Sequence, residues 1–545
     1  MQLRAFTMPT TARARPQIGS VTLSICVAFY IVVALNHTFW GKAIEYFGFP
    51  SFALPLFVIG IFALLVALCV TVSVKYLTKP IFIFFIVSGA AAAWFMDTFG
   101  TIIDADMIRN AAETTPAEAG HLITPGYVLH MLIFAVVPSF LVALVRIEHR
   151  PFFQKFLHNF GVVMASLAIL TAVALANART FAATFRQHRD LLAVQNPIAP
   201  IFSAARYVMQ STKEKHIVAA PLGTDAHVAG PLASHRPRVT VIVAGETARA
   251  ENFALNGYGR QTNPELSKRD INYFTDTSSC GTATAVSLPC MFSVYTRKQY
   301  SHEKGLETES LMDVLSHAGV KAEWWDNNTG SKGVADRISY SSLSQSTDPR
   351  FCDNGECIDG VYLDRLGTWL DTVKGDSVLV IHQIGSHGPA YFKRYPKEFR
   401  RFTPDCTDAQ LDKCSHDEIV NAYDNTILYT DYILASIIDQ LKAREDKMAG
   451  SMIYMSDHGE SLGERGLYLH GAPYILAPSQ QTHVPYVLWQ SPEAAGGIDK
   501  ACLAGQLDKP QSHDNLFHTV LGMMNVVTSV YDPSLDTLAG CRPAA

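Results

Sequence analysis

Five long apolar windows in the first third of the chain constrain its fold more than any other feature. Each is about 20 residues long, which is the length of helix that crosses the hydrocarbon core of a bilayer. The second window contains no charged residue between Phe49 and Val74. We therefore predict an N-terminal, all-α transmembrane bundle of five helices, at about residues 20–40, 49–74, 80–97, 126–145 and 155–178.

Two alternatives would explain these windows without a membrane bundle. The first is a set of buried helices in a soluble protein, but a charge-free run as long as 49–74 argues against it. The second is a cleaved signal peptide, which would explain only the first window and its preceding basic residues. Because four more windows follow, a retained membrane anchor is favoured.

The short loops between the windows predict the orientation of the bundle. Arg4, Arg13 and Arg15 precede the first window, and Lys75 and Lys79 lie between the second and third windows. Arg146, Arg150 and Lys155 lie between the fourth and fifth windows. Loops rich in Lys and Arg stay on the cytoplasmic side. The loop at about 98–125 is acidic instead, with Arg109 as its only Lys or Arg, so it faces outward. An odd number of spans then places the rest of the chain outside.

The cysteines agree with an external location for the C-terminal part. Eight of the ten cysteines follow residue 279, and disulfides persist in oxidising compartments. A thiolate metal site is the alternative, but no CxxC pairs repeat here. Cys26 and Cys69 lie within predicted spans and are expected to be small apolar residues. The expected disulfides are Cys280–Cys290, Cys352–Cys357, Cys406–Cys414 and Cys502–Cys541.

Composition divides the chain into three parts. Residues 1–178 form the predicted transmembrane domain, 179–237 an amphipathic interfacial segment followed by a Pro-, Gly- and His-rich linker, and 238–545 a globular domain. The formal net charge of −5 gives no basic face for nucleic acid, so we expect no nucleic-acid partner.

The globular part has the pattern of an α/β domain. Continuous apolar strands are predicted at 239–244, 377–381 and 451–455, with a helix at 419–441 among them. Buried strands that alternate with helices indicate a mostly parallel sheet. In such sheets the ligand site lies at the carboxyl ends of the strands.

Metal-ligand side chains follow each of these strands. Glu246 follows the first, His382 and His387 the second, and Asp457 and His458 the third. Taken singly, such residues are commonly helix caps or packed imidazoles. Because they converge from three strand ends, they favour a nitrogen and oxygen site that suits catalytic zinc.

The segment Ser279–Cys290 presents a hydroxyl group. It is a turn of small residues that leads into a short helix, and Thr284 is expected in the first helical turn. There the helix dipole and free N–H groups favour an alkoxide and a phosphate oxygen, and metal coordination would activate the hydroxyl as a nucleophile. The alternative is a Ser/Thr-rich turn stapled by Cys280–Cys290 for stability alone.

These segments together resemble the lipid A phosphoethanolamine transferases of Gram-negative bacteria, a family that includes the mobile colistin-resistance enzymes. The resemblance covers essentially the whole chain, and its specific motifs are residues 243–249, 279–293, 384–389, 423–426 and 456–464. It implies an alkaline phosphatase/sulfatase-type fold for the globular domain. It also implies a multi-pass protein of the inner membrane with its catalytic domain in the periplasm.

The resemblance implies roles for particular residues. Glu246, Thr284, Asp457 and His458 would bind zinc, and Thr284 would carry phosphoethanolamine from the donor phosphatidylethanolamine to the acceptor lipid A, in a ping-pong reaction that confers polymyxin and colistin resistance. A second zinc ion at His387 and His470 would be compatible with the pattern, and either histidine could protonate the leaving oxygen. The residues expected near the transferred phosphate are Asn328, Lys332, His387 and His470, and those expected to hold the lipid head group are Asn110 and Glu118.

The sequence also departs from related patterns. Several family members have cysteines where this chain has Ser331 and Ala335, so one disulfide near Lys332 is missing. A sulfatase is disfavoured because Met291 occupies the arginine position of the Cys/Ser-x-Pro-x-Arg signature. Two alternatives stay open: a phosphoglycerol transferase of the same superfamily, and a non-catalytic metal-binding envelope protein.

Overall fold

The computed structural model describes residues 16–542 apart from 49, 149, 215–216 and 233. Two compact units form, of which unit 1 comprises Met1–Asp97 and Pro125–Phe202, and unit 2 comprises Thr98–Thr124 and Ser203–Ala545. This division by compactness differs from the expected boundaries after residues 178 and 237, since the loop 98–124 groups with the globular part. Three residues used for orientation lie outside the described residues: Arg4, Arg13 and Arg15.

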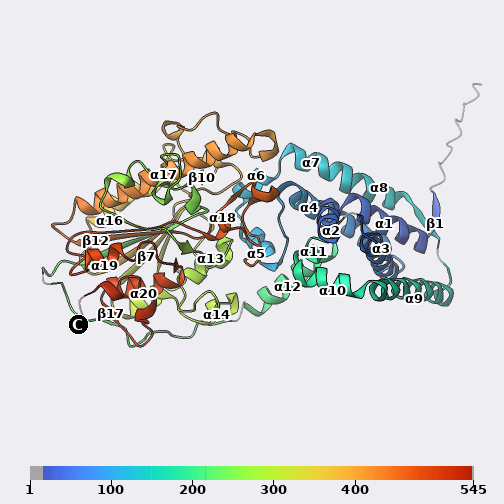
Figure 1. Ribbon diagram of the computed structural model, residues 1–545, viewed down its shortest axis with the longest axis horizontal. Coiled ribbons are helices and arrows are strands. Elements are labelled where there is room, and N and C mark those ends of the chain that lie inside the picture. The colour runs from blue at the N-terminus through green and yellow to red at the C-terminus, as the bar shows by residue number, and fades with distance from the viewer. Residues whose placement is uncertain (1–15, 49, 149, 215–216, 233, 543–545) are drawn as a thin grey trace, which may run out of the picture. The chain divides into compact units, whose positions relative to one another are not determined.

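Four long apolar helices occur in the N-terminal region (Figure 1). They match the second to fifth predicted spans. The helix that matches the fourth predicted span is continuous and consists of α7 (Pro125–Met131), a π-helical turn (Leu132–Val136) and α8 (Val137–Leu144). Each is long and apolar enough to cross a membrane. The other three are α3 (Ala53–Thr71), α4 (Thr78–Phe99) and α9 (Phe152–Ala176).

The first predicted span is a bent pair of helices instead of one straight helix. Helices α1 (Ser20–Ala34) and α2 (His37–Phe47) meet at an angle of 69°. At the break, Asn36 Nδ2 donates to the carbonyl oxygens of Ile31 (2.8 Å) and Asn196 (3.0 Å). The described residues thus contain four helices that are long and apolar enough to cross a membrane. The number becomes five if the bent pair α1–α2 forms a single span.

Loops that the charge pattern assigned to the same side of the membrane lie together at one end of unit 1. Strand β1 (Gln17–Gly19), just before the first span, pairs in parallel with β2 (Arg146–Glu148), between the last two spans. Lys79 Nζ also donates to the carbonyl of Ala143 (2.8 Å). The structure therefore agrees with the predicted grouping of these basic loops.

The segment expected to be interfacial and linking is largely structured. It contains α10 (Ala178–Gln187), α11 (Asp190–Ala193) and α12 (Ile198–Glu214). Beyond them, β3 (His227–Val228) pairs antiparallel with β17 (Val526–Val527), and a bridge joins Ala220 to Thr308. The Pro- and Gly-rich stretch is thus tied to unit 2 by backbone pairing.

A seven-stranded sheet forms the centre of unit 2 (Figure 1). The three predicted strands are its middle, since β4 pairs in parallel with both β11 and β12. The sequence prediction missed the outer strands, which are short or interrupted by charged residues. In spatial order the strands are β5 (Asn272–Phe274), β15 (Tyr486–Gln490), β12 (Ala449–Ser456), β4 (Arg238–Gly245), β11 (Ser377–His382), β7 (Lys321–Asp326) and β8 (Ser339–Ser342).

Helices cover both faces of this sheet (Figure 1). One face carries α16 (Leu363–Leu370) and α17 (His416–Lys442), and the other carries α13 (Thr284–Met291) and α20 (Asp514–Met523). Alternate strand residues such as Ile242 and Ala244 enter a core shared with α13, α15 (Leu311–His317) and α20, as the two-residue repeat of a strand requires. The shorter elements of unit 2 are β6 (Thr277–Ser278), α14 (His302–Glu307), β9 (Cys352–Asp353), β10 (Glu356–Cys357), β13 (Ser461–Leu462), β14 (Tyr468–Leu469), α18 (Ser479–Thr482), α19 (Lys500–Ala504) and β16 (Gln511–Ser512).

The loop between the third and fourth spans folds into two capped helices. Helix α5 (Ala105–Glu113) begins where Asp104 accepts a hydrogen bond from the N–H of Met107, and α6 (Pro116–Leu122) begins where Thr115 accepts one from Glu118. Arg109 pairs with Glu214 (2.9 Å) and His121 with Glu356 (3.0 Å). These pairs attach the loop to the rest of unit 2.

All four expected disulfides are present in unit 2, and they confirm the pairing read from the spacing. Cys26 and Cys69 are free, as expected. The bonds are Cys280–Cys290, Cys352–Cys357, Cys406–Cys414 and Cys502–Cys541.

Candidate active site

The candidate site residues lie at one edge of the sheet, at the carboxyl ends of parallel strands. Glu246 follows β4 directly, Asp457 and His458 follow β12, and His382 is the last residue of β11. A fourth strand, β7, ends in Asp326. Metal-ligand side chains thus gather at the carboxyl ends of four adjacent strands, where the sequence places the ligand site.

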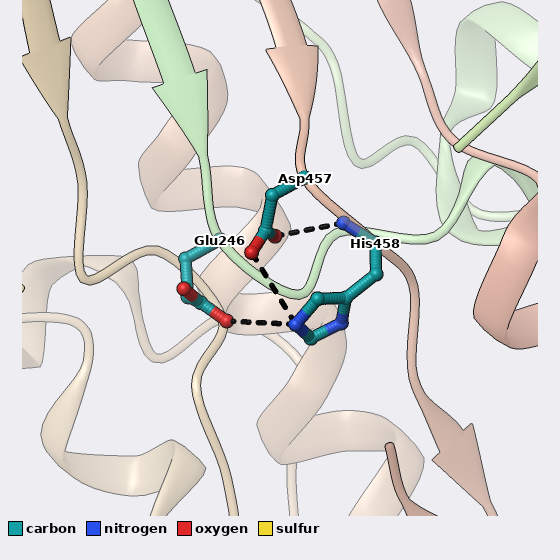
Figure 2. Close-up of side chains that lie close together, drawn as sticks. All are labelled: Glu246, Asp457 and His458. Atoms are coloured by element: carbon teal, nitrogen blue, oxygen red, sulfur yellow. Dashed lines mark hydrogen bonds and ion pairs between the residues drawn. The ribbon is translucent and has the colours of Figure 1, made fainter. Parts of the chain in front are cut away.

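Three of these side chains point toward one another (Figure 2). His458 Nε2 lies 3.3 Å from Glu246 Oε1 and 3.3 Å from Asp457 Oδ2. Ligand atoms of all three residues lie within 4.8 Å of one another, and the three side chains are fully buried. This is the arrangement of protein donors around a metal ion that keeps one position for a reacting group.

Hydrogen bonds fix the orientation of the His458 and Asp457 side chains. His458 Nδ1–H donates to the carbonyl of Gly459 (2.9 Å), so Nε2 is the ring nitrogen that faces the carboxylates. Asp457 Oδ1 accepts from the backbone N–H groups of Thr247 (3.2 Å) and His458 (2.7 Å), whereas its Oδ2 has no hydrogen bond among the described residues.

Electrostatics favour a positive charge at this point. Burial and the Glu246 carboxylate raise the pKa of Asp457 to about 6. Burial opposes protonation of His458, but Asp457 and Glu246 outweigh it and raise the pKa of His458 to about 10. Two buried carboxylates therefore need a cation between them, and a divalent metal bound by Glu246, Asp457 and His458 fits that need.

Thr284 is the first residue of α13 and lies beside the carboxylates. Its Oγ1 donates to Glu246 Oε2 at 3.0 Å and lies 3.4 Å from His458 Nε2. The preceding residue, Ala283, is extended and provides no side-chain cap for the helix. The hydroxyl therefore projects from a helix N-terminus, where the dipole and free N–H groups favour negative charge.

Several contacts hold the turn that presents Thr284. The Cys280–Cys290 bond spans it, and Ser287 Oγ accepts from the N–H of Gly281 (3.1 Å). Ser287 Oγ also donates to the carbonyl oxygen of Asp457. One serine hydroxyl thus joins the helix that carries Thr284 to the backbone of Asp457.

The backbone beside Glu246 is constrained by a close approach. A β-carbon at Gly385 would lie 2.6 Å from the carbonyl oxygen of Glu246, and Gly385 has a φ of +49°. Both observations require glycine at this position. Thr247, next to Glu246, has a φ of 61°, a conformation that β-branched residues rarely adopt. Strained backbone thus fixes the direction of the Glu246 side chain.

Of the four residues expected near the transferred phosphate, Asn328 lies beside Glu246 and Lys332 pairs with a carboxylate. Asn328 Nδ2 donates to Glu246 Oε2 (2.7 Å) and to the carbonyl of Gln383 (2.8 Å). Lys332 Nζ instead lies 2.8 Å from Glu113 Oε2 and donates to the carbonyl of Thr329 (3.0 Å).

The two predicted histidines form a second polar group with acidic partners. His387 Nε2 lies 3.0 Å from Glu118 Oε1, and His470 Nδ1 lies 2.9 Å from Glu460 Oε2. The ring of His470 lies 4.3 Å from that of His458 and 5.4 Å from that of His387. Burial lowers the pKa of His387, but Glu118 and Glu246 outweigh it and raise this pKa to about 9, so the imidazole carries a proton at neutral pH.

The outward loop contributes Glu118 and Glu113 but not Asn110. Among the described residues, no hydrogen bond or ion pair joins the Asn110 side chain to the site; its carbonyl accepts from Thr114 Oγ1 (2.8 Å). Sequence reasoning missed Glu113 and Ser287. Glu113 lies one helical turn beyond Asn110, and Ser287 lies one turn beyond Thr284, so helical spacing was the available signal.

Sequence reasoning identified His382 at a strand end but missed the partner of this histidine, Asp326. His382 Nδ1 lies 2.8 Å from Asp326 Oδ2, and its Nε2 lies 4.0 Å from Glu246 Oε2. Asp326 ends a strand whose Trp324 and Trp325 are strand-favouring residues, so the strand itself was the available signal.

Comparisons with known proteins cover nearly the whole chain. The family model described as "Phosphoethanolamine transferase EptA/EptB" matches residues 61–212, and the one described as "Sulfatase" matches residues 238–526. The chain is 38% identical to phosphoethanolamine transferase EptA of Salmonella typhimurium over 97% of this chain and 98% of that protein. It is 34% identical to phosphatidylethanolamine transferase Mcr-1 of Escherichia coli, over 95% of this chain and 97% of that protein.

A solved structure agrees. The integral membrane protein lipooligosaccharide phosphoethanolamine transferase A (EptA) from Neisseria meningitidis superimposes with a TM-score of 0.94 at 35% identity, over 97% of this chain and 100% of that one. This match includes the helices of the N-terminal region as well as the sheet of unit 2.

Proposed function

The chain belongs to the EptA/EptB family of phosphoethanolamine transferases, and we propose that it transfers phosphoethanolamine through a covalent intermediate on Thr284. The enzyme is an inner-membrane protein whose sulfatase-type catalytic domain faces the periplasm. Its donor in this proposal is phosphatidylethanolamine, and its acceptor is a phosphate group of lipid A. The expected result of this transfer is polymyxin and colistin resistance.

The position of the Thr284 hydroxyl carries this proposal. Oγ1 lies 3.0 Å from Glu246 Oε2 and 3.4 Å from His458 Nε2, at the N-terminus of α13. A threonine that served only to stabilise a turn would not need its oxygen among metal-ligand atoms. A nucleophile needs this placement, because its hydroxyl must lose a proton and its negative charge must be stabilised.

We propose zinc as the metal, with Glu246, Asp457, His458 and Thr284 as its ligands. One imidazole nitrogen and several carboxylate or hydroxyl oxygens form a donor set that zinc accepts in catalytic sites. When bound, zinc would lower the pKa of the Thr284 hydroxyl and offset negative charge on phosphate oxygens. Because His387 and His470 lie together and each has a carboxylate partner, a second zinc there belongs to the same proposal.

In the first half-reaction, Thr284 Oγ1 gives its proton to Glu246 Oε2, the carboxylate oxygen that it faces at 3.0 Å, and forms a bond to the phosphorus of phosphatidylethanolamine. The bond from phosphorus to the glycerol oxygen breaks, and diacylglycerol leaves after its oxygen gains a proton. His387 can supply this proton because Glu118 keeps the imidazole protonated. His470, held by Glu460, is the other candidate donor. Asn328 and Lys332 are proposed to hold the phosphate oxygens.

In the second half-reaction, a phosphate oxygen of lipid A attacks the same phosphorus. The bond to Thr284 Oγ1 breaks, the hydroxyl regains its proton, and the acceptor carries phosphoethanolamine. The added ammonium group reduces the negative charge of the lipid A surface, so a cationic polymyxin binds it less strongly. Glu118, and Asn110 on the same loop, are proposed to hold the lipid head group.

Membrane anchoring follows from the substrates, because moving acyl chains into water costs ~0.8 kcal/mol per methylene group. We propose residues 1–178 as the membrane domain, 179–237 as an interfacial and linking segment, and 238–545 as the catalytic domain. This functional division is distinct from the division by compactness.

Mass spectrometry of the Thr284 peptide tests the covalent intermediate. The full-length protein in detergent is incubated with phosphatidylethanolamine without acceptor and then digested. The expected result is one phosphoethanolamine adduct on Thr284. Thr284→Ala should lack the adduct and Thr284→Ser should retain it, while both keep the unfolding temperature of the wild type. An unmodified Thr284 in wild type that still releases diacylglycerol would overturn the proposal.

Lipid analysis tests the cargo and the acceptor. Lipid A from cells that express the wild type should gain one phosphoethanolamine unit, and lipid A from Thr284→Ala cells should not. A phosphoglycerol adduct would instead support the phosphoglycerol transferase alternative. Polymyxin tolerance that persists in Thr284→Ala cells would support a non-catalytic metal-binding envelope protein.

A further inference from the structure

Unit 1 contains a cavity of about 680 Å³ at the end where its basic loops meet. The cavity lies between the C-terminal end of α3 with the following turn and the N-terminal end of α9. By the orientation that the basic loops predict, this is the cytoplasmic end of the spans. We call it the α3–α9 pocket, and its lining residues are Val70, Thr71, Ser73, Val74, Lys75, Arg150, Pro151, Phe152, Lys155, Phe156, Asn159, Phe160 and Val163.

Charge in the α3–α9 pocket is of one sign. Lys75, Arg150 and Lys155 line it, and no Asp or Glu is among the described lining residues. None of the three cations forms an ion pair within the part of the chain that the structure describes. Lys155 Nζ is buried and has no hydrogen-bond partner there. A buried ammonium group without a partner is costly, so the pocket is built for an anion.

The backbone adds to this preference. Helix α9 is 25 residues long and begins in the pocket at Phe152, after Pro151. It has no side-chain cap and no acidic residue in its first turn. The N–H groups of the first helical turn and the helix dipole therefore face an anion site, at the same end as Arg150 and Lys155.

The apolar residues that line the rest of the α3–α9 pocket favour a lipid over a soluble anion. Four valine and phenylalanine side chains of α9 and one of α3 continue from the basic residues into the membrane-spanning region: Phe152, Phe156, Phe160, Val163 and Val70. Asn159 Nδ2 donates to the carbonyl of Val70 (3.4 Å), whereas Asn159 Oδ1 has no described donor. The pocket thus offers cations and N–H groups for a phosphate, an acceptor for a hydroxyl, and an apolar wall for an acyl chain.

We propose that the α3–α9 pocket binds an anionic phospholipid of the cytoplasmic leaflet. Its phosphate lies between Arg150, Lys155 and the N-terminus of α9, and one acyl chain lies along Phe156 and Phe160. Basic pockets between membrane helices on the cytoplasmic side suit such head groups, because that leaflet is negatively charged. This site lies outside the catalytic machinery and is independent of the proposed transferase reaction.

Native mass spectrometry of the full-length protein in detergent tests the proposal. Phosphatidylglycerol and phosphatidylcholine with the same acyl chains are titrated separately, and the apparent Kd of each is measured. Wild type should bind phosphatidylglycerol more tightly than phosphatidylcholine. Lys155→Gln and Arg150→Gln should each weaken phosphatidylglycerol binding about fivefold, and their binding of phosphatidylcholine should not change.

Arg146→Gln is the matched control, because Arg146 is an exposed cation of the same basic loop that does not line the pocket. Its loss should leave binding unchanged. Equal weakening by Arg146→Gln would show a diffuse attraction of basic loops and overturn the proposal. Equal affinity of wild type for both lipids would overturn it as well.

Two further measurements complete the test. Free glycerol phosphate should not displace phosphatidylglycerol at equal concentration, and displacement would assign the site to a soluble phosphate instead. Phosphatidylglycerol should raise the unfolding temperature of wild type but not of Lys155→Gln. If phosphatidylglycerol raises the unfolding temperature of wild type and Lys155→Gln by the same amount, the lipid binds elsewhere and the proposal fails. Because each protein is compared with itself without lipid, this result does not depend on the stability of Lys155→Gln alone.

Discussion

Lys332 Nζ lies 2.8 Å from Glu113 Oε2, although Glu113 belongs to the loop between two predicted spans and Lys332 to the loop after β7. The Lys332 side chain is only 7% exposed. The lysine proposed to hold the transferred phosphate is thus paired with a carboxylate from the membrane-proximal loop. A substrate phosphate has to compete with Glu113 for this cation.

Glu113→Gln should therefore strengthen donor binding. The Glu113 side chain is 32% exposed, so solvent weakens the pair, and we expect the KM for phosphatidylethanolamine to fall only about two- to fivefold. Steady-state kinetics with a fluorescent donor measures this effect. Asp106→Asn, which removes an exposed charge from the same helix, should leave KM unchanged. A higher KM in Glu113→Gln would instead assign Glu113 the role of holding Lys332 in place.

Ser287→Ala should affect stability and catalysis together. The substitution removes the hydroxyl that joins Gly281 N–H to the carbonyl of Asp457, and it leaves both buried groups without that partner. We expect the free energy of unfolding to fall by about 1–3 kcal/mol. We also expect kcat to fall, because the helix of Thr284 is no longer tied to Asp457, the proposed metal ligand. Thermal unfolding and transfer assays measure the two effects.

Ser316→Ala provides the comparison for Ser287→Ala. The Ser316 hydroxyl donates only to the carbonyl of Met312 in its own helix, so kcat should stay at the wild-type value. A Ser287→Ala enzyme with wild-type kcat would show that the hydrogen bond to Asp457 does not position Thr284.

Much of the site could be predicted because its residues depend on local patterns. Buried strands that end in Glu246, Asp457 and His458 place these side chains at one edge by the geometry of a parallel sheet. The turn before Thr284 predicts a helix N-terminus, and α13 begins there. In both cases a few consecutive residues determine the result.

What the sequence did not predict depends on contacts between distant residues. Hydropathy averages out a single polar residue, so the bend at Asn36, which reaches Asn196, was not visible. Strand β7, with Lys321 and Glu323 among its residues, does not have the apolar run of a central strand. The loop 98–124 groups with unit 2 and pairs with it through distant residues, as in the Arg109–Glu214 ion pair, which no local sequence pattern predicts.

Metal removal should lower stability as well as activity. Without a cation, Glu246 and Asp457 stay close together with only the His458 imidazole between them. Dialysis against a chelator should lower the unfolding temperature, and zinc at about 100 times its Kd should restore about 2.7 kcal/mol. Asp457→Asn should retain less zinc by elemental analysis, whereas the exposed control Asp446→Asn should retain all of it. Unchanged metal content in Asp457→Asn would exclude Asp457 as a ligand.

Asp431 should make stability depend on pH in the opposite direction to a salt-bridged carboxylate. Its oxygens accept from the N–H groups of Glu265 (2.8 Å) and Leu266 (2.9 Å), and the side chain is fully buried in α17. Burial raises the pKa of Asp431 from 3.8 to about 7. Between these values the folded chain keeps a proton that the unfolded chain loses, so the free energy of unfolding decreases as pH rises.

The size of this effect follows from the same pKa difference. It amounts to about 4 kcal/mol across the window and levels off above about pH 8, where both states are ionised. Asp431→Asn cannot ionise, and its amide oxygen still accepts one N–H, so its unfolding temperature should vary less than that of wild type between about pH 4 and 7. The exposed Asp439 on the same helix, paired with Arg269 (2.5 Å), gives the control Asp439→Asn, which should follow the wild-type curve. Parallel curves for wild type and Asp431→Asn would show that Asp431 is already ionised in the folded protein, and that its two N–H partners outweigh the cost of burial.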